Sequence, residues 1–275
     1  MISKTREILH GARIALVLAA LSALVLGGCA SVPNDPEERK AYYETNDPIE
    51  PVNRAIFSFN QGLDAVILKP VASVYKQVLP QTLQDGIRNF LNNLRTPLIL
   101  ANNLLQGDID GAHQTIARFT TNSIIGFGGF GDPAGDLGVK YRSEDFGQTL
   151  GVWGMGEGPY LMLPIFGPSN PRDLIGLVVE SVADPIDIWA DNTDRDAIPI
   201  SRLLLRGIDR RAGNLKTIDE LEKSSLDFYA TVRSLYRQVR ADEIRNGDTD
   251  DTIPSPSISL DEDPALAGPR AQVIK

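Results

Sequence analysis

Residues 47–68 read DPIEPVNRAIFSFNQGLDAVIL, and this stretch decides the fold class. Asp47 precedes a proline and is followed three residues later by Glu50, which is the pattern of a helix start. Apolar residues then recur at alternating spacings of three and four, which predicts an amphipathic helix with one apolar stripe. These residues are Ile49, Val52, Ile56, Phe59, Leu63 and Val66.

A second stripe runs beside the first on the same predicted helix. It is mostly polar, and Pro70 is expected to end the helix because proline cannot donate a backbone hydrogen bond. The stripe consists of Asn53, Phe57, Asn60 and Asp64.

Further segments with helical spacing of apolar residues follow along the chain, so we predict a mostly α fold. A break is expected at 95–97, because a residue before proline avoids the helical region. Gly213 is a weak point in a later helix, and one long final helix ends near Gly247. The predicted helices cover 80–94, 98–106, 110–124, 174–182 and the region from 200 to about 246.

Residues 126–168 differ in composition from the rest of the chain, because they contain 12 of the 24 glycines and seven of the 18 aromatic residues. Dense glycine costs backbone entropy, so we expect tight turns around a ligand or an interface. A loosely packed surface loop is the alternative. Within this segment Ser143 is expected to cap a short helix with Glu144 and Asp145 in its first turn.

Cys29 is the only cysteine and closes the string Leu26-Gly27-Gly28-Cys29. A basic start and the apolar run 14–26 precede it, which together are typical of an export signal. A cysteine directly after small residues resembles the lipobox of bacterial lipoproteins, in which the thiol is acylated and residues 1–28 are removed. Several acyl chains give stable anchoring. An ordinary secretory signal with a chance cysteine is the alternative.

Composition excludes several classes of function. Removing a leader with three bases and one acid changes the formal net charge from −9 to −11, and an acidic chain repels nucleic acid. With Cys29 acylated, no thiolate is left for a metal, and His113 is the one histidine outside the leader. His113 lies in a predicted helix and no G-x-S-x-G motif occurs, so we expect no catalytic triad and no cofactor.

Gly126, Gly128 and Gly131 satisfy the dinucleotide-binding pattern G-x-G-x-x-G literally, with Gly129 as a fourth glycine. That fold needs a strand before the motif and a helix opening within it. Here a helical pattern precedes and a turn follows. A flexible hinge or a close backbone contact explains the glycines better.

Three stretches together resemble the MlaA (VacJ) family of outer-membrane lipoproteins. The first runs from Asn46 to Asn60 and the second from Arg95 to Gly107. The third is long and unusual, and the similarity covers roughly residues 45–240. The third stretch contains Glu144, Asp145, Phe146, Gly147, Gln148, Trp153, Gly158, Pro159, Tyr160, Pro164, Gly167, Pro168, Arg172 and Asp173.

The resemblance implies a ring of amphipathic helices around a central channel, embedded in the inner leaflet of the outer membrane and facing the periplasm. It implies that phospholipid which has strayed into the outer leaflet is passed to a periplasmic carrier resembling MlaC. It also implies association with trimeric porins, and neither chemistry nor a cofactor.

Under this resemblance the residues acquire candidate roles. The polar stripe with Asn53, Asn60 and Asp64 is a candidate channel or inter-helix face, and a solvated face is the alternative. Gly126 to Gly131 resembles the family's flexible loop near the channel. Trp153 and Tyr160 suit the membrane interface, although a buried core position is the alternative. Arg172 and Asp173 are a candidate pair at a helix start, but a simple helix-dipole role for Asp173 is the favoured interpretation.

The predicted organisation is a lipoprotein signal at 1–28, a lipidated tether at 29–46, the helical domain at 47–246 and a disordered acidic tail at 247–275. No segment outside the leader reaches 18 consecutive apolar residues. The alternatives to lipid transport are a lipid-modifying periplasmic enzyme and a structural lipoprotein that braces porins.

Overall fold

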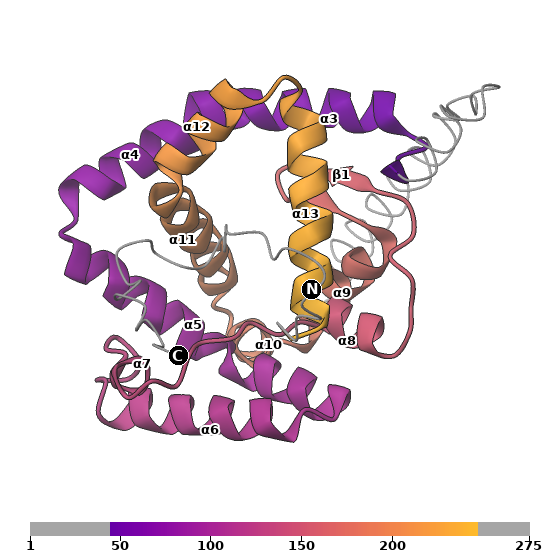
Figure 1. Ribbon diagram of the computed structural model, residues 1–275. Helices are drawn as coiled ribbons and strands as arrows, with labels where there is room; N and C mark the ends of the chain where they lie inside the picture. Colours follow the sequence, from indigo (N-terminus) through magenta and orange to yellow (C-terminus); the bar gives the residue numbers. More distant parts are fainter. Residues whose placement is uncertain (1–44, 247–275) are drawn as a thin grey trace, which may run out of the picture. The chain divides into compact units, whose positions relative to one another are not determined.

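The computed structural model describes residues 45–246, so the predicted signal, most of the tether and the acidic tail lie outside the described residues. The described part is mostly α-helical, as the sequence predicts (Figure 1). It divides into two compact units, one made of 45–61 and 158–170 and the other of 62–157 and 171–246. Each unit is described by itself.

The first unit combines most of α3 (Glu50–Leu63) with a short hairpin. The hairpin strands β1 (Leu161–Leu163) and β2 (Gly167–Ser169) are antiparallel, with Met162 opposite Pro168. Tyr160 and Met162 are buried here. This hairpin is not predicted from the sequence, because strands of three residues show no clear alternation of apolar and polar residues.

The second unit begins with the end of α3 and a π-helical turn, η1 (Asp64–Leu68), followed by α4 (Lys69–Val78). Next come α5 (Gln81–Gln106), α6 (Ile109–Ile124), α7 (Pro133–Asp136) and α8 (Phe146–Val152). The remaining helices are α9 (Pro171–Ala183), α10 (Pro185–Asn192), α11 (Ala197–Gly213), α12 (Leu215–Ser224) and α13 (Phe228–Ile244).

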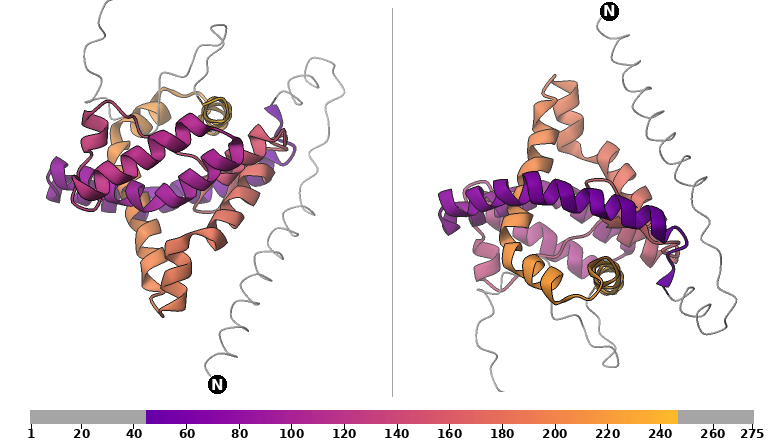
Figure 2. Two further views of the ribbon diagram at one scale, coloured as in Figure 1. Left: turned by 90° about the horizontal axis from the view of Figure 1, so that it is seen from below. Right: turned by 90° about the horizontal axis from the view of Figure 1, so that it is seen from above.

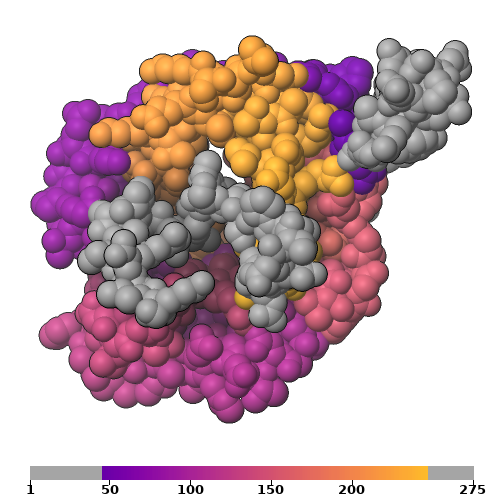
Figure 3. All heavy atoms as spheres, in the orientation of Figure 1, coloured from indigo at the N-terminus to yellow at the C-terminus, as the bar shows by residue number. Residues whose placement is uncertain are grey.

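Helix contacts in the second unit close a circuit. Helix α5 packs on α8, α8 on α9, α9 on α10, α10 on α11, and α11 returns to α5. Helix α13 joins this circuit at α8, while α12 packs on α4. In the space-filling view of Figure 3, α12 and α6 lie at opposite edges of this unit. Helix α10 and the first half of α11 project beyond the layer that contains α5 and α6 (Figure 2).

Two prolines do not end helices where the sequence predicts that they should. At Pro70 the chain passes through η1 directly into α4, because the proline falls in the first turn of α4, where its missing N–H is tolerated. Pro97 lies inside α5, which is one continuous helix rather than two. Residues on both sides of it, Leu91 and Ile99, are buried against neighbouring helices, so packing outweighs the one lost hydrogen bond.

One cap prediction and one helix prediction were also wrong. Asp145, not Ser143, caps α8, because its carboxylate accepts a hydrogen bond from Gln148 N at 2.8 Å. The predicted single final helix is two helices, since Asp227 starts α13 by accepting from Ala230 N at 3.1 Å. The predicted break near Gly213 is confirmed, because α11 ends there.

Candidate functional site

The polar stripe of α3 holds the hairpin of the first unit in place. Asn53 is buried, and its Nδ2 donates to Asp47 Oδ1 at 2.8 Å and to the Tyr160 carbonyl at 3.0 Å. Its Oδ1 accepts from Met162 N at 2.9 Å. Two turns later Asn60 bonds the hairpin in the same way, donating to the Leu163 carbonyl at 2.9 Å. These amides therefore bond the backbone of the hairpin rather than another helix.

The last two members of the stripe have different surroundings. Phe57 is half-buried. Asp64 belongs to the second unit, where its carboxylate accepts two hydrogen bonds from Arg211, at 2.8 and 3.0 Å. Arg211 also reaches Asp219, whose pKa is held below its ordinary value by the hydrogen bond from Lys69 at 2.8 Å. A lipid path along these residues stays a prediction.

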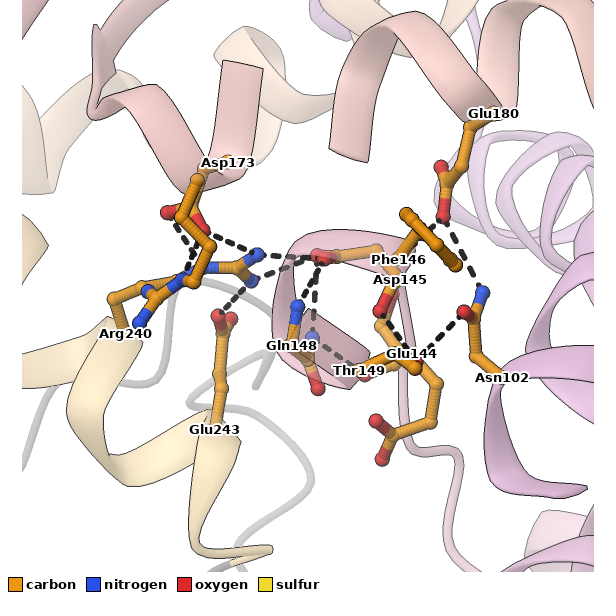
Figure 4. Close-up of polar contacts among 12 residues, drawn as sticks. Asn102, Glu144, Asp145, Phe146, Gln148, Thr149, Asp173, Glu180, Arg240 and Glu243 are labelled. Carbon is orange, nitrogen blue, oxygen red and sulfur yellow. Dashed lines mark hydrogen bonds and ion pairs between the residues drawn. The ribbon is translucent and has the colours of Figure 1, made fainter. Parts of the chain in front are cut away.

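The third family-like stretch forms a buried ionic cluster in the second unit, centred on Arg240 of α13 (Figure 4). The Arg240 guanidinium donates to Asp145 Oδ1 at 2.6 Å and to Asp173 Oδ2 at 2.8 Å. Glu243 accepts a further hydrogen bond at 2.8 Å. Arg172 Nε lies 3.0 Å from Asp173 Oδ1, so the two residues pair, and the favoured helix-dipole interpretation of Asp173 was incomplete.

The cluster lowers the pKa of Asp145 and raises the pKa of Arg240, so it favours the charged form of both residues. Burial alone would raise the pKa of the Asp145 carboxyl, but the hydrogen bonds from Arg240 outweigh it and lower that pKa. Burial alone would lower the pKa of Arg240, and its two carboxylate partners instead raise it. Burial and the neighbouring Asp173 raise the pKa of the Tyr236 hydroxyl, which donates to that carboxylate. The charges are thus neutralised within the chain.

A second polar group adjoins this cluster on α5 and α9. Glu180 accepts from Phe146 N at 3.0 Å and pairs with Arg95 at 3.2 Å. The Thr149 hydroxyl donates to Asn102 Oδ1 at 2.8 Å. Burial raises the pKa of the Glu180 carboxyl above its ordinary value. These contacts tie α5, α8 and α9 together (Figure 4).

Glu144 lies beside this group and is almost fully buried. Its carboxylate accepts from Gln106 Nε2 at 3.0 Å and lies 3.0 Å from Arg142 Nε. Burial raises the pKa of Glu144. Gln148 is buried as well, and its side chain donates to the Ser143 carbonyl at 3.2 Å.

Glycines in the same stretch allow a close approach of two helices. A Cβ on Gly147 would lie 2.8 Å from Asp173 Oδ1, and one on Gly176 would meet the Gly147 backbone nitrogen. Any larger side chain at either position would push α8 from α9. Close packing of α8 on α9, rather than a tight turn, therefore explains Gly147 and Gly176.

Other residues of the stretch shape the hairpin region or the helix end. Gly158 and Gly167 have positive φ, which favours glycine. Tyr160 is buried at 2% exposure, so its predicted interfacial position is wrong and the core alternative is confirmed. Trp153 remains half-exposed and donates to the Leu105 carbonyl at 2.9 Å. Pro159, Pro164 and Pro168 complete this segment.

The Gly126–Gly131 loop follows helix α6, not a strand, which agrees with rejecting the dinucleotide motif. Gly128 and Gly129 have φ of 73° and 98°. The loop is fixed to α5, because Phe130 stacks on Phe90 with ring centroids 4.7 Å apart. Movement of this loop stays a prediction.

No cluster of three potential metal ligands occurs within residues 45–246. His113 is exposed on α6. The ionic clusters above bring carboxylates to arginines rather than to a nucleophile, so their chemistry is that of structural ion pairs.

Two structural features, an ion-pair partner and a cavity, are not predicted from the sequence. Arg240 is about 95 residues from Asp145 and lies in a helix without a local motif, so no signal in the sequence pairs them. The second feature is an apolar cavity of ≈ 400 Å³ between α5, α10 and α11. Its lining residues are widely separated in the sequence, so no local pattern predicts the cavity. Arg202, Arg206 and Arg210 recur every four residues along α11 beside it.

Large apolar side chains are exposed along several helices of the second unit. No described helix is long and apolar enough to cross a membrane. The exposed faces instead have the amphipathic character of helices that lie in a membrane interface. They include Val71, Val74 and Val78 on α4, Val178 and Val182 on α9, and Ile200, Leu203 and Leu204 on α11.

The fold and its clusters define a mostly α-helical protein with structural ion pairs inside and apolar helix faces outside. Comparison with known families gives a match to the MlaA lipoprotein model over residues 45–243. The chain belongs to the MlaA lipoprotein family.

Similar proteins agree with this assignment. The chain is 36% identical over 239 residues to the intermembrane phospholipid transport system lipoprotein MlaA of Escherichia coli, covering 86% of this chain and 90% of that protein. It is 31% identical to the lipoprotein of the same name from Haemophilus influenzae, covering 84% and 91%. A solved structure described as "Structural basis for maintenance of bacterial outer membrane lipid asymmetry" has 33% identity and a TM-score of 0.65, covering 72% of this chain and 98% of that one.

Proposed function

We propose that this chain is an outer-membrane lipoprotein that removes mislocalised phospholipid from the outer leaflet and passes it to a periplasmic carrier. The observation that carries the proposal is the family match over residues 45–243, together with relatives named for intermembrane phospholipid transport. The exposed apolar faces of α4, α9 and α11 support residence in a lipid environment.

The proposal includes a specific placement. Cys29 carries the lipid anchor, and the helices lie as a ring in the inner leaflet, facing the periplasm, around a central channel. Phospholipid moves through the channel without covalent chemistry, so no catalytic residue or cofactor is required. The partners are a periplasmic carrier resembling MlaC and a trimeric porin, and Gly126–Gly131 acts as a flexible loop near the channel.

The direct test measures phospholipid on the cell surface. Cells lacking the gene are scored with an enzyme that transfers an acyl chain only from outer-leaflet phospholipid. We expect a rise that the wild-type gene reverses. An unchanged signal would contradict a role in lipid asymmetry and would leave the structural role with porins.

The anchor has its own test. We expect Cys29→Ser to leave the precursor unprocessed or mislocalised and to fail to lower surface phospholipid, whereas Cys29 wild type restores both. Normal outer-membrane sorting of Cys29→Ser would remove the lipoprotein assignment of that residue.

A further inference from the structure

Arg206 on α11 differs from the other arginines around it. It is half-buried, and its Nη2 donates to the Leu91 carbonyl at 3.2 Å. Within residues 45–246 no carboxylate forms an ion pair with it. A buried cation normally needs such a partner, because leaving water costs an ion its hydration. Arg206 therefore holds a positive charge that this part of the chain does not neutralise.

Its neighbours do not supply the missing charge. Arg95 is already paired with Glu180, and Arg202 with Asp184 and Asp187. Burial, and then the field of Arg95, lower the pKa of Arg206 to about 10. Arg206 consequently remains cationic at neutral pH, in a place where the surrounding guanidinium groups repel it. An external anion would relieve this repulsion.

The cavity described above adjoins this charge. Leu91, whose carbonyl Arg206 bonds, lines the ≈ 400 Å³ cavity, and so does Arg202, one helical turn from Arg206. Such a volume falls in the range of about 300–1,000 Å³ that small-molecule sites occupy. The other lining residues are almost all apolar: Phe90, Leu94, Ile186, Trp189, Ile198 and Leu205.

Arg202 lines the cavity but presents almost no polar surface to it. Its side chain is only 11% exposed, and its two terminal nitrogens bond Asp184 and Asp187 at 2.9 and 2.6 Å. Its buried Nε has no hydrogen-bond partner among the described residues. Because this Nε is fully buried, a ligand in the cavity does not reach it, and the two carboxylates neutralise the charge of Arg202.

We propose that this cavity takes one acyl chain of a phospholipid and that Arg206 binds the phosphate of the same molecule. Apolar walls, with the cation of Arg206 next to the lining residue Leu205 on α11, match an amphipathic anion, which carries both chemistries in one molecule. The inference rests on the proposed function, since it names the residues that receive the lipid. Arg206 is a specificity residue for lipids that carry a phosphate.

The test uses the only two tryptophans of the chain, Trp153 and Trp189. Trp189 lines the cavity, so a Trp153→Phe background reports from that position alone. The purified full-length chain in detergent is titrated with a short-chain phosphatidylglycerol that carries bromine on its acyl chains. Bromine quenches tryptophan only on close approach. We expect saturable quenching of Trp189.

Variants then separate the charge from the apolar cavity. In Arg206→Met we expect the quenching midpoint to rise about tenfold or more, because a charge-assisted hydrogen bond to phosphate is lost. Arg206→Lys should recover part of this affinity. The matched control is Arg210→Met, which removes the same charge from the same helix at an exposed position. Equal midpoints in Arg206→Met and Arg210→Met would overturn the proposal.

Two further outcomes decide which ligand is bound. A brominated fatty-acid methyl ester, which has no phosphate, should quench equally in the parent and in Arg206→Met. If inorganic phosphate displaced the brominated lipid as well as an unlabelled phospholipid does, the site would be a free-phosphate site and the lipid assignment would be overturned. Intact binding with unchanged surface phospholipid in cells would instead contradict the proposed function and leave this site standing.

Discussion

The two arginine-rich regions of the second unit treat buried charge in opposite ways. Around Arg240, the carboxylates of Asp145 and Asp173 neutralise the cation. Around Arg206, the described chain supplies only a backbone carbonyl, and an apolar cavity lies alongside. The first region is complete by itself, which is the property of a structural cluster. The second is complete only with an anion, which is the property of a binding site.

The largest effect should come from breaking the complete cluster. Arg240→Met leaves Asp145 and Asp173 buried without their cation, so we expect the free energy of unfolding to fall by about 3–5 kcal/mol. Urea denaturation of the purified chain measures it. Arg245→Met is the control, because Arg245 pairs with Asp242 only at 3.8 Å on the exposed side of α13, and its loss should cost less than about 1 kcal/mol. Similar losses in both variants would show that the cluster adds nothing special.

The packing of the two regions should differ as well. Gly176→Ala places a methyl group against the Gly147 backbone, so we expect a loss of about 1–3 kcal/mol from overpacking. Gly207→Ala, next to Arg206 on α11, meets no atom within 4 Å and should instead stabilise by about 0.5–1 kcal/mol through helix propensity. Thermal unfolding of both variants makes the comparison. A loss at Gly207 would mean that the region around Arg206 is closely packed.

At acid pH, Asp145 and Asp187 should change the free energy of unfolding in opposite directions as the pH rises. The folded-state pKa of Asp145 lies below its unfolded value, so its contribution is present above about pH 4 and is lost as the pH falls through the folded pKa. Burial and the adjacent Asp184 raise the pKa of Asp187, so that group costs stability as the pH rises from about 4 through its folded pKa. Urea midpoints from pH 3 to 7 should therefore rise less steeply with pH at the acid end in Asp145→Asn, and more steeply with pH in Asp187→Asn, than in the wild type. Parallel curves for the two variants would contradict the assigned directions.

The smallest expected effect is the change in the free energy of unfolding caused by replacing Arg206. Arg206→Met removes a cation that lacks a partner, so we expect unfolding free energy equal to the wild type or higher by up to about 1 kcal/mol. A loss as large as that of Arg240→Met would show that the chain does neutralise Arg206. Urea denaturation in the absence of lipid measures it.

The helices were largely predictable from the sequence, because the apolar periodicity is strong and Gly107 and Gly213 mark helix ends locally, although α3 begins at Glu50, three residues after the predicted cap Asp47. The prolines at 70 and 97 misled, since the tolerance of a proline depends on its position within the helix and on packing that only the tertiary structure supplies. Three-residue strands carry too little pattern to be found.

The candidate site was less predictable for a related reason. Arg172 and Asp173 could be named as a candidate pair because the two are adjacent, although a helix-dipole role for Asp173 was favoured. The polar stripe with Asn53 and Asn60 was visible because it follows one helix. The partners of those residues, such as Arg240 and the hairpin backbone, lie far away in the sequence and leave no local signal. The missing counter-ion of Arg206 is visible only once its neighbours are placed.

The most direct test of the contrast is whether phospholipid stabilises the chain through Arg206. The wild type, Arg206→Met and Arg245→Met are unfolded in urea with and without a short-chain phospholipid at about 100 times its dissociation constant. We predict that lipid stabilises the wild type and Arg245→Met by about 2.7 kcal/mol, and Arg206→Met by much less. Equal stabilisation of all three proteins would contradict the account.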